Sequence, residues 1–324
     1  MKKILLLLTA FFTMSAYVQA DGLTATLQQG DVMTPFYGVD AFKQAYEAAD
    51  SGAVITLSSG SFNTVTELAK PVTLIGAYAF NASSPEVTIL PSLTIKANYV
   101  KVEGIYFSGN VSLDAIKNCQ IKRCWIKIEL NSTAAHTNTL IDQCVVKYDY
   151  AVANGQNYCI KNSTLLSFYA MNTTSNLAYI TNCVVWEYKG GKRPYAIYKN
   201  SMLGSNSPYE SLDLYSSSEF YNNIFFNTYS SYKFTASFPS GCINEGNING
   251  KNWSDYFTSL DTFYPAPHFK DGVNPLGQDG TQIGIYGGTG FSEYPNIPRV
   301  LNKEVDSNTN AEGKINVKIT VKAE

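Results

Sequence analysis

Short runs of alternating apolar and polar residues, separated by Asn, Gly and Ser, recur along most of the chain. The run ITNCVV at Ile180 is matched by VEGIYF, IKRCWI, IDQCVV, IKNSTL, YKNSML and FYNNIF. The fourth residues of these seven copies lie 18 to 22 residues apart and are Ile105, Cys124, Cys144, Ser163, Cys183, Ser201 and Asn223. A repeat of about 20 residues predicts a solenoid, because each unit can bury its apolar face only against the next.

Each repeat has the pattern of a strand, since its apolar residues are β-branched or aromatic and alternate with polar ones. The third position predicts a sharp bend, which Asn and Gly tolerate in the left-handed conformation, and stacked amides there can hydrogen-bond from coil to coil. Arg123 and Gln143 depart from this pattern, so we expect an irregular ladder at that end. The full set is Gly104, Arg123, Gln143, Asn162, Asn182, Asn200 and Asn222. The fourth position should point into a narrow core. About 20 residues per coil suits a parallel β-helix with three faces.

Different patterns precede and follow the repeats. Between Gly38 and Gly52, apolar residues at helical spacing predict a short amphipathic capping helix, with Val39 and Phe42 on its buried face. The tail KINVKITVKAE alternates strictly from Ile315 to Val321, which predicts a strand pair or an appended module. This β appendage can serve as a structural cap or as an attachment element.

A family resemblance is visible at both ends of the repeat array. The capping helix, then VITLSSGSF, KPVTLIG and YVKVEGIYF, resembles the entry into the right-handed parallel β-helix of the pectin-lyase-like superfamily. The segment VNPLGQDGTQIGIYGG is similar to the end of many secreted bacterial β-helices of that group. The resemblance covers residues 38–288 and implies an all-β fold. We therefore predict a signal peptide at residues 1–20, a β-helix with its cap at 21–290, and a linker and β appendage at 291–324.

The first twenty residues and the composition restrict location and partners. MKKILLLLTAFFTMSAYVQA has the charged start, short apolar run and small residues of a secretory signal peptide, which predicts a periplasmic, cell-surface or extracellular protein without membrane insertion. The net charge is −2 and falls to about −4 when Lys2 and Lys3 are removed, so nucleic acid is excluded as a partner. Only 15% of residues are charged, whereas the chain has 23 Tyr. Such a surface suits a neutral ligand such as a sugar, and we expect a monomer.

The six cysteines allow two interpretations. Adjacent coils lie about 4.8 Å apart, so Cys124 and Cys144 can form either a disulfide or a ladder of free thiols. No spacing typical of a zinc site occurs, and the only histidines are His136 and His268, so we predict no metal site from these residues. IKNCQI at Ile116 matches the repeat five residues early, which leaves the register around Cys119 open.

The resemblance implies two kinds of catalytic site. Lyases of the superfamily use a calcium-binding acidic set with a Lys or Arg base, and the hydrolases use clustered aspartates and a histidine between glycines. Neither pattern transfers to this chain. The remaining candidates for a lyase, with calcium as its cofactor, are Asp142, Lys147 and Asp149, which are also explained as solvated residues on a strand. We otherwise expect no cofactor.

Outward aromatics are the better candidates for ligand binding, because flat rings stack on sugars. Counting from Cys183, Val185 should point into the core and Trp186 away from it. The loop YKGGKRPY adds Tyr188 and Arg193. The candidate ligand-binding set is Tyr148, Tyr150, Phe168, Tyr169, Trp186, Tyr188 and Arg193. The sequence thus favours a polysaccharide-binding protein without a recognisable catalytic site. The alternatives are a polysaccharide lyase or glycoside hydrolase with an unfamiliar site, and a structural or adhesive envelope protein.

Overall fold

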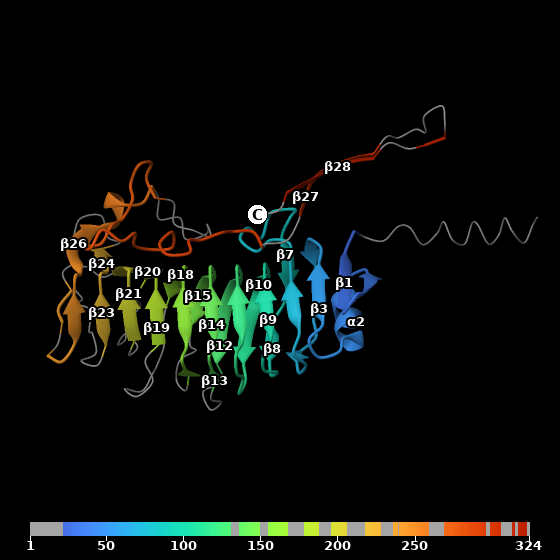
Figure 1. Ribbon diagram of the computed structural model, residues 1–324, viewed down its shortest axis with the longest axis horizontal. Coiled ribbons are helices and arrows are strands. Elements are labelled where there is room, and N and C mark those ends of the chain that lie inside the picture. Colours follow the sequence, from blue (N-terminus) through green and yellow to red (C-terminus); the bar gives the residue numbers. More distant parts are fainter. Residues whose placement is uncertain are drawn as a thin grey trace, which may run out of the picture.

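The chain forms a β-solenoid of parallel stacked coils about 20 residues apart, as predicted (Figure 1). The computed structural model describes residues 22–130, 136–149, 155–167, 178–187, 196–205, 218–227, 236–238, 240–258, 269–295, 299–305, 313–314 and 317–322. Two long sheets, called sheet A and sheet B below, run along the coil axis, and each has 12 strands. The short pair β13 (His136–Thr137) and β16 (Gly155–Gln156) forms a further small sheet beside them.

Sheet A begins with the antiparallel pair of β1 and β2, and its parallel strands follow from β3 onward. From β1 onward its strand order follows the sequence, while β2 lies at the outer edge: β2 (Val32–Tyr37), β1 (Thr24–Gln29), β3 (Val54–Leu57), β6 (Thr73–Ile75), β9 (Lys101–Glu103), β11 (Gln120–Lys122), β14 (Leu140–Asp142), β17 (Cys159–Lys161), β19 (Ala178–Thr181), β21 (Ala196–Lys199), β23 (Glu219–Tyr221) and β25 (Ile243–Glu245).

Sheet B alternates with sheet A along the chain and is joined to it through the bends. Its strands are β4 (Gly60–Ser61), β7 (Thr88–Leu90), β10 (Tyr106–Leu113), β12 (Trp125–Leu130), β15 (Val145–Asp149), β18 (Thr164–Ser167), β20 (Val184–Glu187), β22 (Met202–Ser205), β24 (Ile224–Asn227) and β26 (Ile248–Asn252), with β5 (Glu67–Leu68) and β8 (Leu93–Ile95) paired beside them.

The seven sequence repeats stack in the predicted register. Ile121, for example, pairs with Val102 on one side and with Ile141 on the other. An eighth repeat that the sequence analysis missed follows at Asn244, which pairs with Phe220. The first positions of the seven sequence repeats point inward and are buried, so their apolar side chains build the continuous core of the coil, whereas Asn244 is exposed.

The third positions form a row of bends along one edge of the solenoid, which we call the first corner row. All seven residues have positive φ, between 46° and 70°. Arg123 and Gln143 adopt the same backbone conformation as the asparagines, so the irregularity predicted at that end lies in their side chains and not in the bend. Each makes a contact that holds the bend, since Arg123 forms an ion pair with Glu103 and Gln143 donates to the Gly290 carbonyl.

A second row of bends lies at the other end of the sheet A strands. Asn118, Asn138 and Asn157 have positive φ. Their amides form a ladder, in which Asn138 Nδ2 donates to Asn118 Oδ1 and Asn157 Nδ2 donates to Asn138 Oδ1, each at 2.9 Å. This explains why IKNCQI matches the repeat five residues early. It contains a bend of its own, and Cys119 follows it into the core.

The fourth positions are fully buried and satisfy the backbone at the bend. The Cys144 amide donates to Ser163 Oγ at 3.0 Å, and the Cys183 amide donates to Ser201 Oγ at 3.1 Å, each one coil further on. The Cys124 amide donates likewise to Cys144 Sγ at 3.4 Å. Small polarisable or hydroxyl side chains therefore fit this position for two reasons, namely size and hydrogen bonding. All six cysteines are free thiols.

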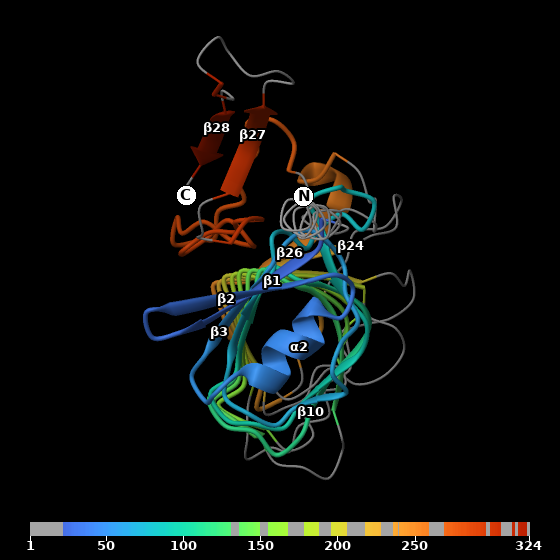
Figure 2. The same ribbon diagram turned by 90° about the vertical axis from the view of Figure 1, so that its right-hand side faces the viewer.

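A helix closes the N-terminal end of the coil, as predicted (Figure 2). The helix α2 (Ala41–Ala48) buries Phe42, Ala45 and Tyr46 against the end of the core. Val39 precedes the helix and is 48% exposed, so its predicted place on the buried face is wrong. No helix in the described ranges is long and apolar enough to cross a membrane.

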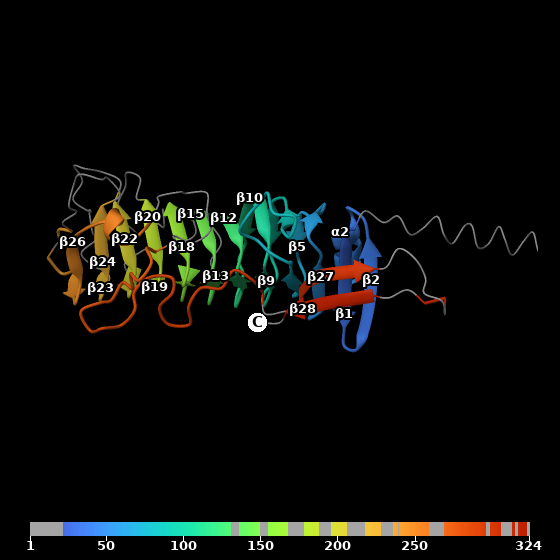
Figure 3. The ribbon, with the colours of Figure 1, turned by 90° about the horizontal axis from the view of Figure 1, so that it is seen from above.

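The chain turns back after the last coil. Following the short 3-10 helix η1 (Trp253–Asp255), residues 269–295 run along the outside of the solenoid toward its N-terminal half (Figures 1 and 3). We call residues 269–295 the C-terminal strap. Beyond it, β27 (Arg299–Val305) and β28 (Val317–Lys322) form an antiparallel pair, the β appendage that the alternating tail predicted.

The side chains and backbone of the first corner row hold the strap. Asn222 Nδ2 donates to Asp279 Oδ1 at 2.8 Å, and the Gly284 amide donates to the Asn200 carbonyl at 2.9 Å. Asn162 Nδ2 donates to the carbonyls of Ile285 and Gly287. Most of these amides therefore bind the strap rather than one another, although Asn222 also donates to Asn200 Oδ1.

Candidate functional site

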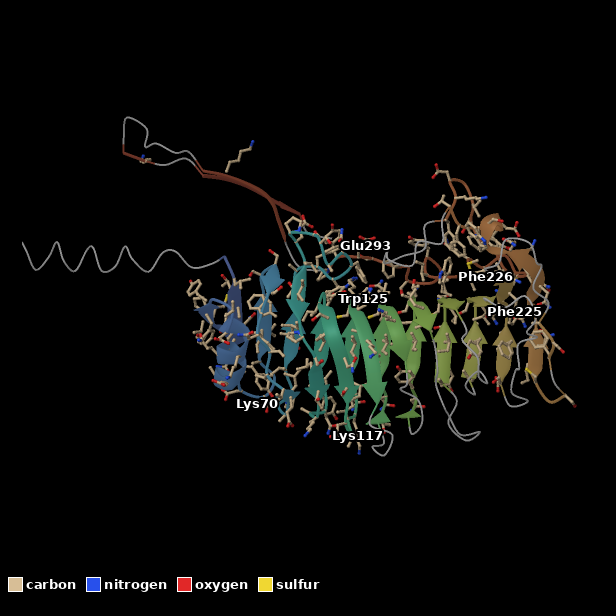
Figure 4. The ribbon with its side chains drawn as sticks, turned by 180° about the vertical axis from the view of Figure 1, so that it is seen from behind. Lys70, Lys117, Trp125, Phe225, Phe226 and Glu293 are labelled. Carbon is tan, nitrogen blue, oxygen red and sulfur yellow. The ribbon has the colours of Figure 1, made fainter. Side chains whose placement is uncertain are left out.

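The outer face of sheet B packs against the strap and, near its C-terminal end, against Phe257. Trp186 points away from the coil core, as predicted, but only 7% of it is exposed. Its ring meets Phe257 edge-on at a centroid distance of 5.1 Å and lies 6.0 Å from Phe226. Phe226 lies on this strap side of the coil, whereas its neighbour Phe225 belongs to the interior (Figure 4). The expectation that Trp186 offers an exposed ring to a ligand is therefore wrong.

Two of the three catalytic candidates, Asp142 and Lys147, are not brought together, and the side chain of Asp149 is outside the described part of the chain. Asp142 lies on β14 of sheet A, whereas Lys147 and Asp149 lie on β15 of sheet B. The carboxylate of Asp142 is 3.6 Å from Lys161 Nζ instead, and Lys147 Nζ lies 5.9 Å from the centre of the Trp125 ring. Burial raises the pKa of Asp142, although Lys161 and Lys122 oppose the shift. The described side chains thus do not place Lys147 beside the carboxylate of Asp142, as the predicted lyase site would require.

Most of the other predicted ligand-binding residues lie outside the part of the chain that the structure describes. These are Tyr150, Phe168, Tyr169, Tyr188 and Arg193. Tyr148 lies on β15, and its side chain, like that of Asp149, is also outside the described part.

A groove lies on the outer face of sheet A near the C-terminal end of the solenoid. It is open to solvent and has a volume of about 680 Å³. Four consecutive strands, β19, β21, β23 and β25, form its floor, and the strap forms one wall. The lining residues are Tyr179, Thr181, Ile197, Lys199, Tyr221, Asn222, Glu245, Gly246, Gln278 and Asp279.

The repeat itself places the floor residues. On a strand, the residues before and after an inward residue both point outward. Ile180 points into the core, so Tyr179 and Thr181 face the groove, and Tyr179 is 42% exposed. Phe220 is likewise inward, which turns Tyr221 outward two strands further on. The groove thus has two tyrosines on its floor, with β21 between them.

The wall of the groove is fixed by the last corner residue. Asp279 Oδ1 accepts from Asn222 Nδ2 at 2.8 Å and from the Thr281 amide at 2.9 Å. Gln278 Nε2 donates to the Asn247 carbonyl at 3.3 Å. A Cβ at Gly277 would overlap the Asn222 amide, so glycine permits the close approach of the strap at this point. The strap therefore holds Gln278 and Asp279 in place at the groove.

Carboxylates outnumber cations around the groove. Among the described residues that line it, Lys199 is the one lysine, whereas Glu245 and Asp279 are carboxylates. A third carboxylate, Glu219, accepts from the Tyr221 hydroxyl at 2.9 Å, and this hydrogen bond raises the pKa of Tyr221. The pKa of Asp279 is lowered by the Thr281 amide, which stabilises the ionised form. Planar polar side chains beside aromatic rings are suited to binding sugar hydroxyls while a ring face stacks on tyrosine.

Tyr179 and Tyr221 were not predicted, because the predicted outward residues follow the fourth position of the repeat, whereas these two tyrosines lie beside the first. A usable signal was present. The residues that precede the first position are mostly polar or aliphatic, as in Lys101, Gln120 and Leu140, so an aromatic at Tyr179 stands out. The wall residues carry no such signal, because their place depends on contacts across the fold.

The described residues contain no group of three or more His, Cys, Asp or Glu side chains that could hold a metal ion. Comparison with known proteins finds no matching family model, curated protein or solved structure.

Proposed function

We propose that this β-solenoid is a secreted or cell-surface protein that binds a polysaccharide in the groove on sheet A. One observation carries the proposal, namely the pairing of two outward tyrosines with a rim of amides and carboxylates in an open groove. The signal-peptide pattern at residues 1–20 and the low content of charged residues support it. So does the resemblance of residues 38–288 to the pectin-lyase-like superfamily, whose enzymes act on polysaccharides.

The shape of the groove favours a chain over a single sugar. Tyr179 and Tyr221 lie on strands separated by β21 and are offset by two residues along the strands, so their attachment points are about 12 Å apart. A ligand that contacts both rings spans at least two sugar units. The groove is also open to solvent, so a polymer can enter it sideways without threading.

The test is affinity electrophoresis of the mature chain through gels that contain polysaccharides. We expect Tyr179→Ala and Tyr221→Ala each to raise the Kd by up to about tenfold, because a stacked aromatic contributes about 0.5–1.5 kcal/mol beyond its buried area. Tyr37→Ala is the matched control, since Tyr37 on β2 is 58% exposed and lies outside the groove. Retention on no polysaccharide, or equal losses in all three variants, would contradict the proposal.

A further inference from the structure

The charged residues of the groove affect which kind of polysaccharide it can bind. This inference rests on the polysaccharide-binding function proposed above. Enzymes of the pectin-lyase-like superfamily act on acidic polysaccharides, so a groove of that type is expected to present cations to its ligand. The described lining of this groove presents the carboxylates of Glu245 and Asp279 and one ammonium, that of Lys199. Glu219 adds a third carboxylate beside Tyr221.

No other cation of the described residues offsets this excess within the groove. Lys161 is the next lysine along the outward row that contains Lys199, and it lies on β17, one strand beyond the floor. Its Nζ is 3.6 Å from Asp142 Oδ2, so its charge is already opposed by a carboxylate. Lys122, one strand beyond Asp142, is further still from the groove.

The acidic rim is also held in place. Two donors, Asn222 Nδ2 and the Thr281 amide, fix Asp279 Oδ1, and both favour its ionised form. An acidic sugar that entered the groove would bring its carboxylate beside like charges, whose repulsion opposes binding. A sugar hydroxyl can instead donate to the same oxygens.

We infer that the groove selects polysaccharides without acidic groups, with sugar rings stacked on Tyr179 and Tyr221 and hydroxyls donated to Glu245 and Asp279. In this arrangement the carboxylates act both as acceptors for a neutral glycan and as a barrier to a polyuronate or a sulfated glycan. The positive charge of Lys199 partly offsets these carboxylates, so its removal should increase the preference for neutral over acidic polysaccharides.

The experiment compares glycans that share a backbone and differ in charge. Suitable pairs are methyl-esterified and de-esterified pectin, hydroxyethyl and carboxymethyl cellulose, and neutral and sulfated galactan, each tested for retention of the mature chain at low salt. We expect the neutral member to be retained more strongly in every pair that is bound. Stronger retention on the acidic members would overturn the inference while leaving polysaccharide binding intact. If the chain were retained neither on these glycans nor on any other, the inference and the proposed function would both be overturned.

Charge variants separate selection by the groove from the net charge of the protein. Glu245→Gln should reduce the preference for the neutral member by roughly two- to fivefold, the range expected from one exposed charge pair. Lys199→Gln should increase it. Glu47→Gln is the matched control, because Glu47 is exposed on α2 at the far end and changes the net charge equally. An equal change in Glu245→Gln and Glu47→Gln would contradict selection by the groove, and the preference should weaken as salt is raised.

Discussion

Replacement of Asn162 tests how the strap is held. The side chain is 1% exposed, its Nδ2 donates to the carbonyls of Ile285 and Gly287, and its Oδ1 accepts from Thr289 Oγ1 at 3.1 Å. Asn162→Gly keeps the backbone conformation, whose φ is 46°, but deprives the two buried carbonyls of their donor. Leaving such groups unsatisfied costs about 1–3 kcal/mol. Asn162→Ala adds about 1–2 kcal/mol, because alanine is strained in the left-handed region.

The tryptophans allow release of the strap to be followed separately from unfolding of the coil. The chain has three, Trp125, Trp186 and Trp253, and all three pack in the clusters that the strap covers. Tryptophan fluorescence in urea therefore reports on strap docking, whereas far-UV circular dichroism reports on the coils. In both Asn162 variants we expect the fluorescence transition to move to lower urea than the dichroism transition, with a larger shift for Asn162→Ala.

The control is Asn157→Gly in the second row of bends. Asn157 also has positive φ, at 54°, but it is exposed and its amide binds only Asn138 within the described residues. Both glycine variants raise the conformational entropy of the unfolded chain by a similar amount, so the difference between their free energies of unfolding isolates the contribution of the strap contacts. If Asn162→Gly and Asn157→Gly shift both transitions by the same amount, the strap is not held by Asn162 and the reasoning fails.

Two further predictions concern the repeat and its charges. Cys144→Ser should keep most of the stability, because a hydroxyl can still accept from the Cys124 amide. Cys144→Ala leaves that buried amide unpaired and should lower the free energy of unfolding by about 1–3 kcal/mol. Equal losses for the two variants in urea denaturation would contradict this role for the fourth position. Burial raises the pKa of Asp142, so the folded state takes up this proton at a higher pH than the unfolded state. Its stabilising effect is then present at low pH and is lost as pH rises through the raised pKa. The free energy of unfolding of wild type relative to Asp142→Asn should therefore increase on acidification from neutral pH, and an unchanged or decreasing difference would refute the assignment.

Much of the coil could be predicted from sequence because single positions of the repeat meet single physical demands. The first position must be apolar, the third must tolerate positive φ, and the fourth must be small and hydrogen-bonding. Arg123 and Gln143 show the limit of this reasoning. Neither residue favours positive φ, yet both adopt it, because the register of the neighbouring coils and contacts with Glu103 and Gly290 outweigh local preference.

The candidate site was harder to predict because alternation gives the direction of a side chain but not what covers it. Trp186 points away from the coil as expected, yet it is buried by Phe257 and by the strap, which lie far along the sequence. Tyr179 has the same outward direction and remains exposed, because the strap passes beside sheet A at that point and not over it. Long-range coverage of this kind leaves no mark in a repeat of about 20 residues.

The strap also has a consequence for the order in which the molecule is completed. Each coil can stack on the one before it as the chain is synthesised, since its contacts are with its immediate neighbours. The partners of Asn162 in the strap are made more than a hundred residues later, at Ile285 and Gly287. A chain that stops short of them can still build coils but leaves Trp186 and its neighbours uncovered. A truncated chain therefore exposes apolar surface that the strap covers in the full-length protein, and a protease or chaperone can bind there.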